Sequence, residues 1–284
     1  WLAVDDADIG IIEVGGTVGD IESEPYLEAI RQMRLDAGKE NVLYLHLTLV
    51  PYIPTSGELK TKPTQHSAKR LREIGIQPDI LLCRCDRDLP QEIREKIALF
   101  CNVNTENVIA APDVDNIYEL PLVFSDQKLD EQILSQLSIW TGEGRLDDWR
   151  QMLHRWRNAS GSTEIAIVGK YVHLGDTYRS LNEALRHGGI PHDTNVLLRH
   201  IDSEDLDASN LEEKLKGCSG ILVPGGFGKR GVEGKILAIQ YARENKLPFF
   251  GICLGMQLAV IEYARHLLQL GKASSREFHP DSPD

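Results

Sequence analysis

Residues 247–257 place a single thiol in a very tight turn between an apolar run and a helical pattern. The apolar run leads directly into Gly251-Ile252-Cys253-Leu254-Gly255. Because glycines occupy both second neighbours of the cysteine, no Cβ crowds a strained strand-to-helix turn. Such a turn raises Cys253 to the carboxyl edge of a sheet, near a helix N-terminus that favours thiolate over thiol. The pattern predicts a nucleophile for acyl transfer, and the alternative is a buried structural cysteine.

The totals exclude several classes of protein. A chain of 284 residues is expected to form two domains. Its net charge of -12 argues against general binding to nucleic acid or to an anionic membrane. No apolar run reaches the roughly 18 residues that cross a bilayer, and the first residues lack a basic leader. Five scattered cysteines do not suit a disulfide framework, so we expect a reducing, cytoplasmic compartment.

Apolar runs alternate with helical patterns along the chain, which predicts an α/β fold with two doubly wound, mostly parallel sheets. Strands are expected at 9–14, 41–50, 80–83, 107–111, 164–169, 196–201, 220–223 and 247–252. Helices are expected at 24–37, 64–74, 90–101, 129–137, 177–187, 211–215, 232–245 and 254–270. The small polar residues at 158–162 mark the best boundary. We therefore expect one domain at 1–140, a linker at 141–162 and a second domain at 163–284.

A second glycine-rich turn, Pro224-Gly225-Gly226-Phe227-Gly228, follows the strand expected at 220–223. Alone it is an ordinary turn, but beside Cys253 its N–H groups and that of Leu254 would form an oxyanion hole. A thiol hydrolase also needs a base. The candidates by residue type are His173, His187, His192, His200, His266 and His279. In the triplet His279-Pro280-Asp281 a carboxylate lies nearby, yet the triplet falls in an irregular tail, so we expect the base beyond residue 284.

A basic patch interrupts this acidic chain at residues 60–65, Lys-Thr-Lys-Pro-Thr-Gln, and continues with Lys69, Arg70 and Arg72. Pro63 favours extended geometry at Lys62, so Lys60 and Lys62 should point the same way. Two ammonium groups and the N-terminus of the following helix suit a phosphate. The alternative is a solvated basic face.

Three acids, Glu13, Asp20 and Glu22, surround a glycine-rich turn after the strand expected at 9–14. Carboxylates at the carboxyl end of a strand suit Mg²⁺ bound to nucleotide phosphates. The glycine pattern alone is weak evidence, and the sequence contains no Walker loop of the form G-x-x-x-x-G-K-[ST].

The cysteine turn and the Pro224–Gly228 turn together resemble the class I (triad) glutamine amidotransferases. Residues 13–23 (EVGGTVGDIES), 56–65 (SGELKTKPTQ), 168–171 (VGKY) and 251–257 (GICLGMQ) are similar to the CTP synthase family. This resemblance extends along essentially the whole chain. It implies a P-loop synthetase-like (dethiobiotin-synthetase-like) first domain and a flavodoxin-like glutamine amidotransferase second domain.

The resemblance also implies an activity. Members of this family are ligases of pyrimidine nucleotide biosynthesis that aminate UTP to CTP. ATP and Mg²⁺ phosphorylate the 4-oxygen of UTP, and ammonia from glutamine hydrolysis displaces that phosphate. GTP activates the family, CTP inhibits it, and the working form is a homotetramer.

Residue roles follow position by position. Cys253 matches the thioester-forming nucleophile, and Glu13 matches an Mg²⁺ ligand. The positions that match glutamine and oxyanion contacts are Gly226, Leu254, Gly255, Met256, Gln257 and Glu277. Those that match the UTP and CTP site are Asp20, Ile21, Glu22, Lys60, Thr61, Lys62, Pro63, Thr64, Gln65 and Lys96. Asp113 and Val114 match an ATP adenine contact, and Arg230 and Gly231 are candidates for the response to GTP.

Departures from the family pattern leave alternatives open. The family's phosphate-binding loop and a further Mg²⁺-binding Asp would precede residue 1, and its catalytic His and Glu would follow residue 284. We therefore expect these 284 residues alone to complete neither half-reaction. The alternatives are an inactive or regulatory truncated paralogue that binds nucleotides, and an amidase of the cobyric-acid type.

Overall fold

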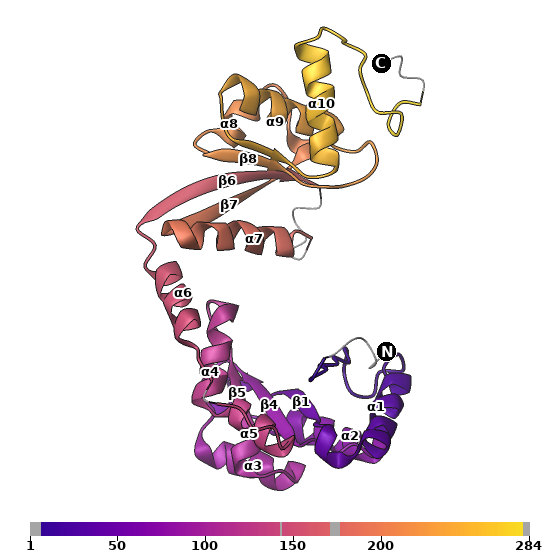
Figure 1. Ribbon diagram of the computed structural model, residues 1–284, viewed down its shortest axis with the longest axis vertical. Coiled ribbons are helices and arrows are strands. Elements are labelled where there is room, and N and C mark those ends of the chain that lie inside the picture. Colours follow the sequence, from indigo (N-terminus) through magenta and orange to yellow (C-terminus); the bar gives the residue numbers. More distant parts are fainter. Residues whose placement is uncertain (1–6, 143, 171–176, 281–284) are drawn as a thin grey trace. The chain divides into compact units, whose positions relative to one another are not determined.

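A computed structural model describes residues 7–142, 144–170 and 177–280 (Figure 1). The chain divides into two compact units, one ending at Asp148 and the other beginning at Trp149. The predicted linker, 141–162, contains the whole of helix α6 (Asp147–Arg157) and the start of strand β6 (Gly161–Gly169). The candidate base His173, and Asp281 of the histidine triplet, lie outside the described residues.

The first unit is built on a parallel sheet in the order β1-β4-β5. Its strands are β1 (Leu45–Leu49), β4 (Ile80–Cys85) and β5 (Val108–Pro112), and a short antiparallel hairpin joins β2 (Tyr52–Ile53) to β3 (Glu58–Leu59). The helices are α1 (Glu24–Ala37), α2 (Lys62–Ile74), α3 (Gln91–Cys101), α4 (Leu120–Asp126) and α5 (Leu129–Gln136). Short 3₁₀ turns, η1 to η3, occupy Lys39–Asn41, Thr105–Asn107 and Ile117–Glu119.

Strand β4 forms the centre of this unit, as its unbroken apolar sequence predicts. Leu81 and Cys83 on one face pack against Ile97 of α3, and Ile80 and Leu82 on the other face pack with Leu129 of α5. Because both faces of the strand are covered, the alternation of polar and apolar residues seen in half-buried strands is absent.

The prediction of a strand at residues 9–14 is wrong. This segment has no regular structure and pairs with no strand among the described residues. Ile11 is 95% exposed, and Ile9 and Ile12 are also exposed. An apolar run becomes a buried parallel strand only where neighbouring strands accept and donate its backbone hydrogen bonds. The sequence alone does not show whether such neighbours exist.

The start of helix α2 also differs from the prediction, because Lys62 is its first helical residue and not an extended one. Proline near the start of a helix needs no hydrogen-bond acceptor, and its fixed φ suits the helix. Those preferences outweigh the bias of Pro63 toward extended geometry at the residue before it. As a result, Lys60 and Lys62 do not project as two residues of one extended strand.

The second unit has a parallel sheet in the order β7-β6-β8-β9. Beside β6, its strands are β7 (Thr194–Asp202), β8 (Gly220–Val223) and β9 (Phe249–Gly251). The helices are α7 (Arg179–Gly189), α8 (Leu211–Leu215), α9 (Val232–Glu244) and α10 (Leu254–His266), with 3₁₀ turns η4 and η5 at Ile190–His192 and Ser203–Asp205. Figure 1 shows α7 on one face of the sheet and α8, α9 and α10 on the other.

Two features of this second sheet determine where a site can form. Ala166, Ile221 and Ile236 belong to one buried cluster, which fixes α9 against the sheet. In chain order the strands lie 2-1-3-4, which is the doubly wound, flavodoxin-like arrangement. Connections leave the sheet in opposite directions between β6 and β8, and ligands in such folds bind at the carboxyl ends of these strands.

Candidate active site

The turn at Cys253 has the strained geometry that the sequence predicts. Cys253 has φ 50° and ψ -103°, between the end of β9 and the first residue of α10. A residue that carries a side chain rarely adopts a positive φ, so the surrounding structure must hold Cys253 in this conformation. The Gly255 N–H donates to the Ile252 carbonyl at 2.9 Å, and the Gln257 N–H donates to the Cys253 carbonyl at 3.1 Å. The turn therefore presents an exposed thiol at the start of a helix.

Both flanking glycines are required by the packing of this turn. A Cβ on Gly251 would lie 2.5 Å from the Gly255 carbonyl carbon, and a Cβ on Gly255 would lie 2.1 Å from the Val223 carbonyl oxygen. Separations this short cannot be accommodated without moving backbone. The Ile252 N–H donates to that same Val223 oxygen at 3.0 Å, which ties the turn to the end of β8.

The glycine-rich turn after β8 lies directly beside the cysteine. A Cβ on Gly225 would be 3.6 Å from the Cys253 Cβ, and a Cβ on Gly226 would be 3.6 Å from Leu254 Cδ2. Leu254 and Gly255 are buried, whereas Met256 and Gln257 are exposed on the first turn of α10. The N–H groups at the start of a helix have no intrahelical acceptor. Backbone donors of the kind that stabilise an oxyanion therefore lie near the thiol.

Two side chains distant in sequence hold the glycine-rich turn. Lys170, the residue after β6, donates from Nζ to the Phe227 carbonyl at 2.8 Å and to the Gly228 carbonyl at 3.1 Å. The Gly228 N–H in turn donates to Glu277 Oε1 at 3.1 Å. The predicted contact Glu277 is thus brought to the turn, and the neighbouring Phe278 anchors the tail by burying its ring.

None of the described histidines makes a hydrogen bond with the Cys253 thiol. His279 Nδ1 instead pairs with Ser274 Oγ at 2.8 Å, and His266 Nδ1 lies 3.1 Å from Glu262 Oε1. His200 pairs with Asn182, and His187 stacks edge-on against Trp156. The described part of the second unit therefore presents an exposed candidate thiol near backbone donors, and none of its described histidines bonds to that thiol.

In the first unit, the carboxyl side of β1 gathers a set of charges. Lys60 forms an ion pair with Glu58. The pKa of that carboxyl is lowered, first by the Lys60 hydrogen bond and further by the charge of Lys96. Two predicted site residues, separated in the sequence by helix α2 and strand β4, thus act on one carboxylate. The candidates at the start of α2 instead form hydrogen bonds with other groups near that helix.

Four of the candidates at the start of α2 have hydrogen bonds within the protein. Thr64 is fully buried and donates from Oγ1 to the Leu49 carbonyl at 3.0 Å. Gln65 Nε2 donates to Thr61 Oγ1 at 2.9 Å, and both side chains are buried. Lys62 donates to Gln65 Oε1 at 3.1 Å and also lies over the Phe100 ring. Lys62 and Pro63 are exposed, so an incoming anion would meet Lys62 first.

The acidic candidates Glu13, Asp20 and Glu22 line one cavity of about 490 Å³. Gly16, which also lines this cavity, and Gly19 have positive φ, at 84° and 108°. Asp20 Oδ2 accepts from the Thr17 N–H at 2.8 Å, which closes the turn. The fourth candidate here, Ile21, is 83% exposed, so its side chain is available for contact with a ligand.

Asp113 follows β5, with Val114 next to it, at the same edge of the sheet. Its carboxylate accepts from Arg84 Nε at 3.1 Å, and its N–H donates to the Cys85 carbonyl at 2.9 Å. The residues predicted to bind nucleotide after β1 and after β5 are therefore at the carboxyl ends of parallel strands, where α/β sheets bind ligands.

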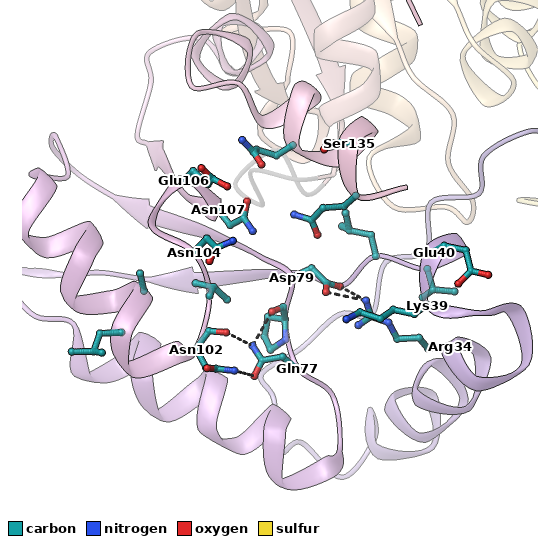
Figure 2. Close-up of a pocket in the computed structure, with 18 residues that line it drawn as sticks. Arg34, Lys39, Glu40, Gln77, Asp79, Asn102, Asn104, Glu106, Asn107 and Ser135 are labelled. Carbon is teal, nitrogen blue, oxygen red and sulfur yellow. Dashed lines mark hydrogen bonds and ion pairs between the residues drawn. The ribbon is translucent and has the colours of Figure 1, made fainter. Parts of the chain in front are cut away.

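A larger cavity, of about 810 Å³, opens in the first unit at the amino ends of the strands (Figure 2). It contains none of the predicted site residues. In its lining Arg34 and Asp79 pair at 2.9 Å, and Gln77 bonds to the backbone around Asn102. Size alone therefore does not make this cavity the active site.

The residues described here neither assemble a metal cage nor form a membrane span. They contain no group of three or more His, Cys, Asp or Glu side chains arranged to hold a metal. Mg²⁺ commonly needs only one or two carboxylates, completed by water and phosphate oxygens, so the acids of the 490 Å³ cavity fit that ion. Among the same residues, no helix is long and apolar enough to cross a membrane.

Two buried lysines near the cysteine were not singled out from the sequence. Lys170 lies within the family-like stretch 168–171, and its position just after a strand is the signal that would have identified it. Lys235 lies in α9 among apolar residues, and its side chain is completely buried. A lone lysine on the apolar face of an amphipathic helix is the corresponding signal.

Comparisons with known proteins match two family models to different parts of the chain. The family model for the CTP synthase N-terminus matches residues 2–139, and that for glutamine amidotransferase class-I matches residues 173–281. CTP synthase of Maridesulfovibrio salexigens is 58% identical over 98% of this chain and 51% of its own length. CTP synthase of Geobacter metallireducens is 60% identical over 97% of this chain and 51% of its own.

The chain spans about half the length of these curated relatives. Among solved structures, the Trypanosoma brucei CTPS glutaminase domain with bound acivicin is 46% identical, with a TM-score of 0.40. That match covers 43% of this chain and 47% of the other. From the two matched models and the near-complete coverage by curated relatives, the chain belongs to the CTP synthase family.

Proposed function

We propose that this chain carries residues for both halves of glutamine-dependent CTP synthesis, the ATP-dependent amination of UTP to CTP. The observation that carries the proposal is the strained turn at Cys253 beside Gly225 and Gly226, in a chain whose residues 2–139 match the CTP synthase N-terminus. A nucleotide-binding half and an ammonia-releasing half on one chain suit a ligase that consumes glutamine nitrogen.

In the glutamine half, the Cys253 thiolate adds to the side-chain amide carbon. The carbonyl oxygen becomes an oxyanion that the N–H groups of Gly226 and Leu254 stabilise. The C–N bond then breaks, ammonia leaves with a proton from the base, and a γ-glutamyl thioester remains. Water hydrolyses the thioester to glutamate and restores the thiol. We assign contacts with glutamine to Gly255, Met256, Gln257 and Glu277, the last of which is supported by its hydrogen bond to the glycine-rich turn.

In the nucleotide half, the 4-oxygen of UTP attacks the γ-phosphorus of ATP and ADP leaves. Ammonia then adds to carbon 4, and phosphate departs to give CTP. We assign the UTP phosphates to Lys60, Lys62 and Lys96, which is supported by the convergence of Lys60 and Lys96 on Glu58. Thr61, Pro63, Thr64 and Gln65 shape the start of α2, and the Thr64 and Gln65 bonds support a rigid platform there.

The remaining assignments concern the nucleobases of the bound nucleotides, the metal ion and the effectors. Asp20, Ile21 and Glu22 sense the pyrimidine of UTP or of the inhibitor CTP, and Asp113 with Val114 contacts the adenine of ATP. Mg²⁺, held by Glu13, would neutralise the charge of the transferred phosphoryl group. GTP acts as the activator through Arg230 and Gly231. The full enzyme acts in the cytoplasm as a homotetramer, and the domain limits at 140 and 163 belong to this proposal.

The glutamine half can be tested through the thiol itself. Four of the five cysteines are buried and only Cys253 is exposed, so alkylation reports on one site. We expect a chloroketone analogue of glutamine to modify Cys253 faster than iodoacetamide does, and L-glutamine to protect it. Cys253→Ser is the control and should take up no label. Equal, unprotected reaction with both reagents would refute the assignment.

The nucleotide half is tested by titrating the chain with UTP and measuring the heat of binding by calorimetry. We expect binding in the wild-type chain, and about tenfold weaker binding in Lys60→Met, because one charge-assisted contact with phosphate is lost. Lys39→Met, at an exposed position away from the carboxyl edge, is the matched control. Absence of UTP binding would favour the amidase of the cobyric-acid type, against which the match to the CTP synthase N-terminus already argues.

A further inference from the structure

The second unit contains a buried amine with no bonding partner. Lys235 is 0% exposed and is among the largest fully buried side chains of the described residues. Its Nζ makes no hydrogen bond with any of them. Val232, Ile236 and Ile239, on the same side of α9, belong to the apolar core. Because an unbonded buried donor costs free energy, a lysine here needs an explanation that packing does not supply.

The amine reaches the peptide that faces Cys253. Lys235 Nζ lies 3.8 Å from the position that a Cβ on Gly226 would occupy. The preceding residue, Gly225, is the one whose Cβ position is 3.6 Å from the Cys253 Cβ. The Gly225–Gly226 peptide therefore has the thiol near its first residue and the Lys235 amine near its second.

The orientation of this peptide decides whether an oxyanion hole exists. A trans peptide is planar, and its N–H and C=O groups point in opposite directions. When the Gly226 N–H faces the substrate oxygen, the Gly225 carbonyl must face away from it. Among the described residues, neither group makes a backbone hydrogen bond, so the backbone does not fix the orientation.

We propose that Lys235 is a positioning residue for the oxyanion hole. Its Nζ donates to the Gly225 carbonyl when that carbonyl turns inward, and this holds the Gly226 N–H toward the oxygen of the substrate amide. The Lys235 amine and the Gly225 carbonyl, neither of which has another hydrogen-bond partner among the described residues, then bond to each other. The inference rests on the proposed hydrolysis of glutamine and adds to it a residue that holds the donor in place.

The other buried lysine already acts in this way on the same turn. Lys170 Nζ accounts for the carbonyls of Phe227 and Gly228. Lys235 would account for the carbonyl at the start of the turn. Burial, the largest cause, and the Lys170 charge together lower the pKa of Lys235 to about 8, and Asp202 opposes the shift. Ammonium and neutral amine both carry N–H donors, so the role persists in either protonation state.

The test compares two ways of alkylating Cys253. With the chloroketone analogue of glutamine, the thiolate adds to the ketone to give a tetrahedral oxyanion. Sulfur then bonds to the chloromethyl carbon as chloride leaves, its bond to the carbonyl carbon breaks, and the ketone re-forms. With iodoacetamide, sulfur displaces iodide directly, and no oxyanion forms. The two rates, measured by mass spectrometry on the 284-residue chain, separate the oxyanion hole from the reactivity of the thiol.

For Lys235→Met we expect the chloroketone rate to fall at least about tenfold, a part of the loss seen when an oxyanion donor is removed outright. The iodoacetamide rate should stay within about twofold, because the thiol is not disturbed. Thermal unfolding should occur at the same temperature or higher, since an unpaired buried polar group has been replaced by an apolar one. Ile239→Met, a buried change on the same helix, is the matched control and should alter neither rate.

Two further variants keep the test decisive if Lys235→Met folds poorly. Lys235→Leu should repeat the loss, and Lys235→Gln, which retains an N–H donor, should recover most of the chloroketone rate. Equal rates in wild type and both apolar variants, or a parallel fall with both reagents, would overturn the role of Lys235. A wild-type chain that shows no preference for the glutamine analogue would refute the proposed glutamine hydrolysis itself, and the inference with it.

Discussion

Replacing Cys253 with glycine should make the second unit more stable, although it removes the proposed nucleophile. Cys253 has φ 50° and ψ -103°, a backbone conformation that residues with a Cβ rarely adopt. A strained backbone conformation of this kind costs on the order of 1–3 kcal/mol. Glycine relieves that strain but gives back about 0.5–1 kcal/mol through the greater freedom of the unfolded chain. Since the thiol is exposed, little packing is lost.

The net expectation is a stabilisation of about 1 kcal/mol. For a unit that runs from residue 149 to residue 284, this corresponds to a rise of roughly 3–5 °C in its melting temperature. Differential scanning calorimetry would measure the shift, because the two units can unfold in separate transitions. The first unit should be unaffected and serves as an internal reference.

Cys253→Ala is the matched control, because alanine loses the thiol but keeps the Cβ and therefore the strain. It should unfold within about 0.5 kcal/mol of the wild type. If the glycine and alanine variants melt at the same temperature, the turn stores no strain at Cys253, and the reasoning from its backbone angles is wrong. If that shared temperature is above the wild type's, the sulfur atom and not the backbone is the source of the cost.

Three further outcomes follow from the packing. Gly255→Ala should abolish alkylation of Cys253 by the glutamine analogue and destabilise the second unit by more than about 2 kcal/mol, whereas Gly271→Ala, which meets open space, should do neither. At pH 8, iodoacetamide should label one cysteine in the folded chain and five in urea; early labelling of a second thiol would contradict the described burial. Burial lowers the pKa of His46 to about 4, so stability should fall as the pH drops from 6.5 toward 4, by at most about 3 kcal/mol, and His46→Asn should lose that dependence in urea titrations.

Local sequence was sufficient to predict the turn at Cys253. Two glycines beside one cysteine, after an apolar run and before a helical pattern, specify a steric requirement confined to a few residues. The same holds for β4, whose continuous apolar run indicates a strand buried on both faces. In both cases the physical cause lies within a single short window of sequence.

Tertiary contacts alone decided the rest. Residues 9–14 have the composition of a buried strand, but a strand forms only where another supplies its hydrogen bonds, and no window of sequence shows that partner. The meeting of Lys60 with Lys96 at Glu58, and of Lys170 and Lys235 at the glycine-rich turn, depends on helices and strands folding across one another. The sequence alone therefore determined which residue is the candidate nucleophile, and the tertiary structure decided which residues surround it.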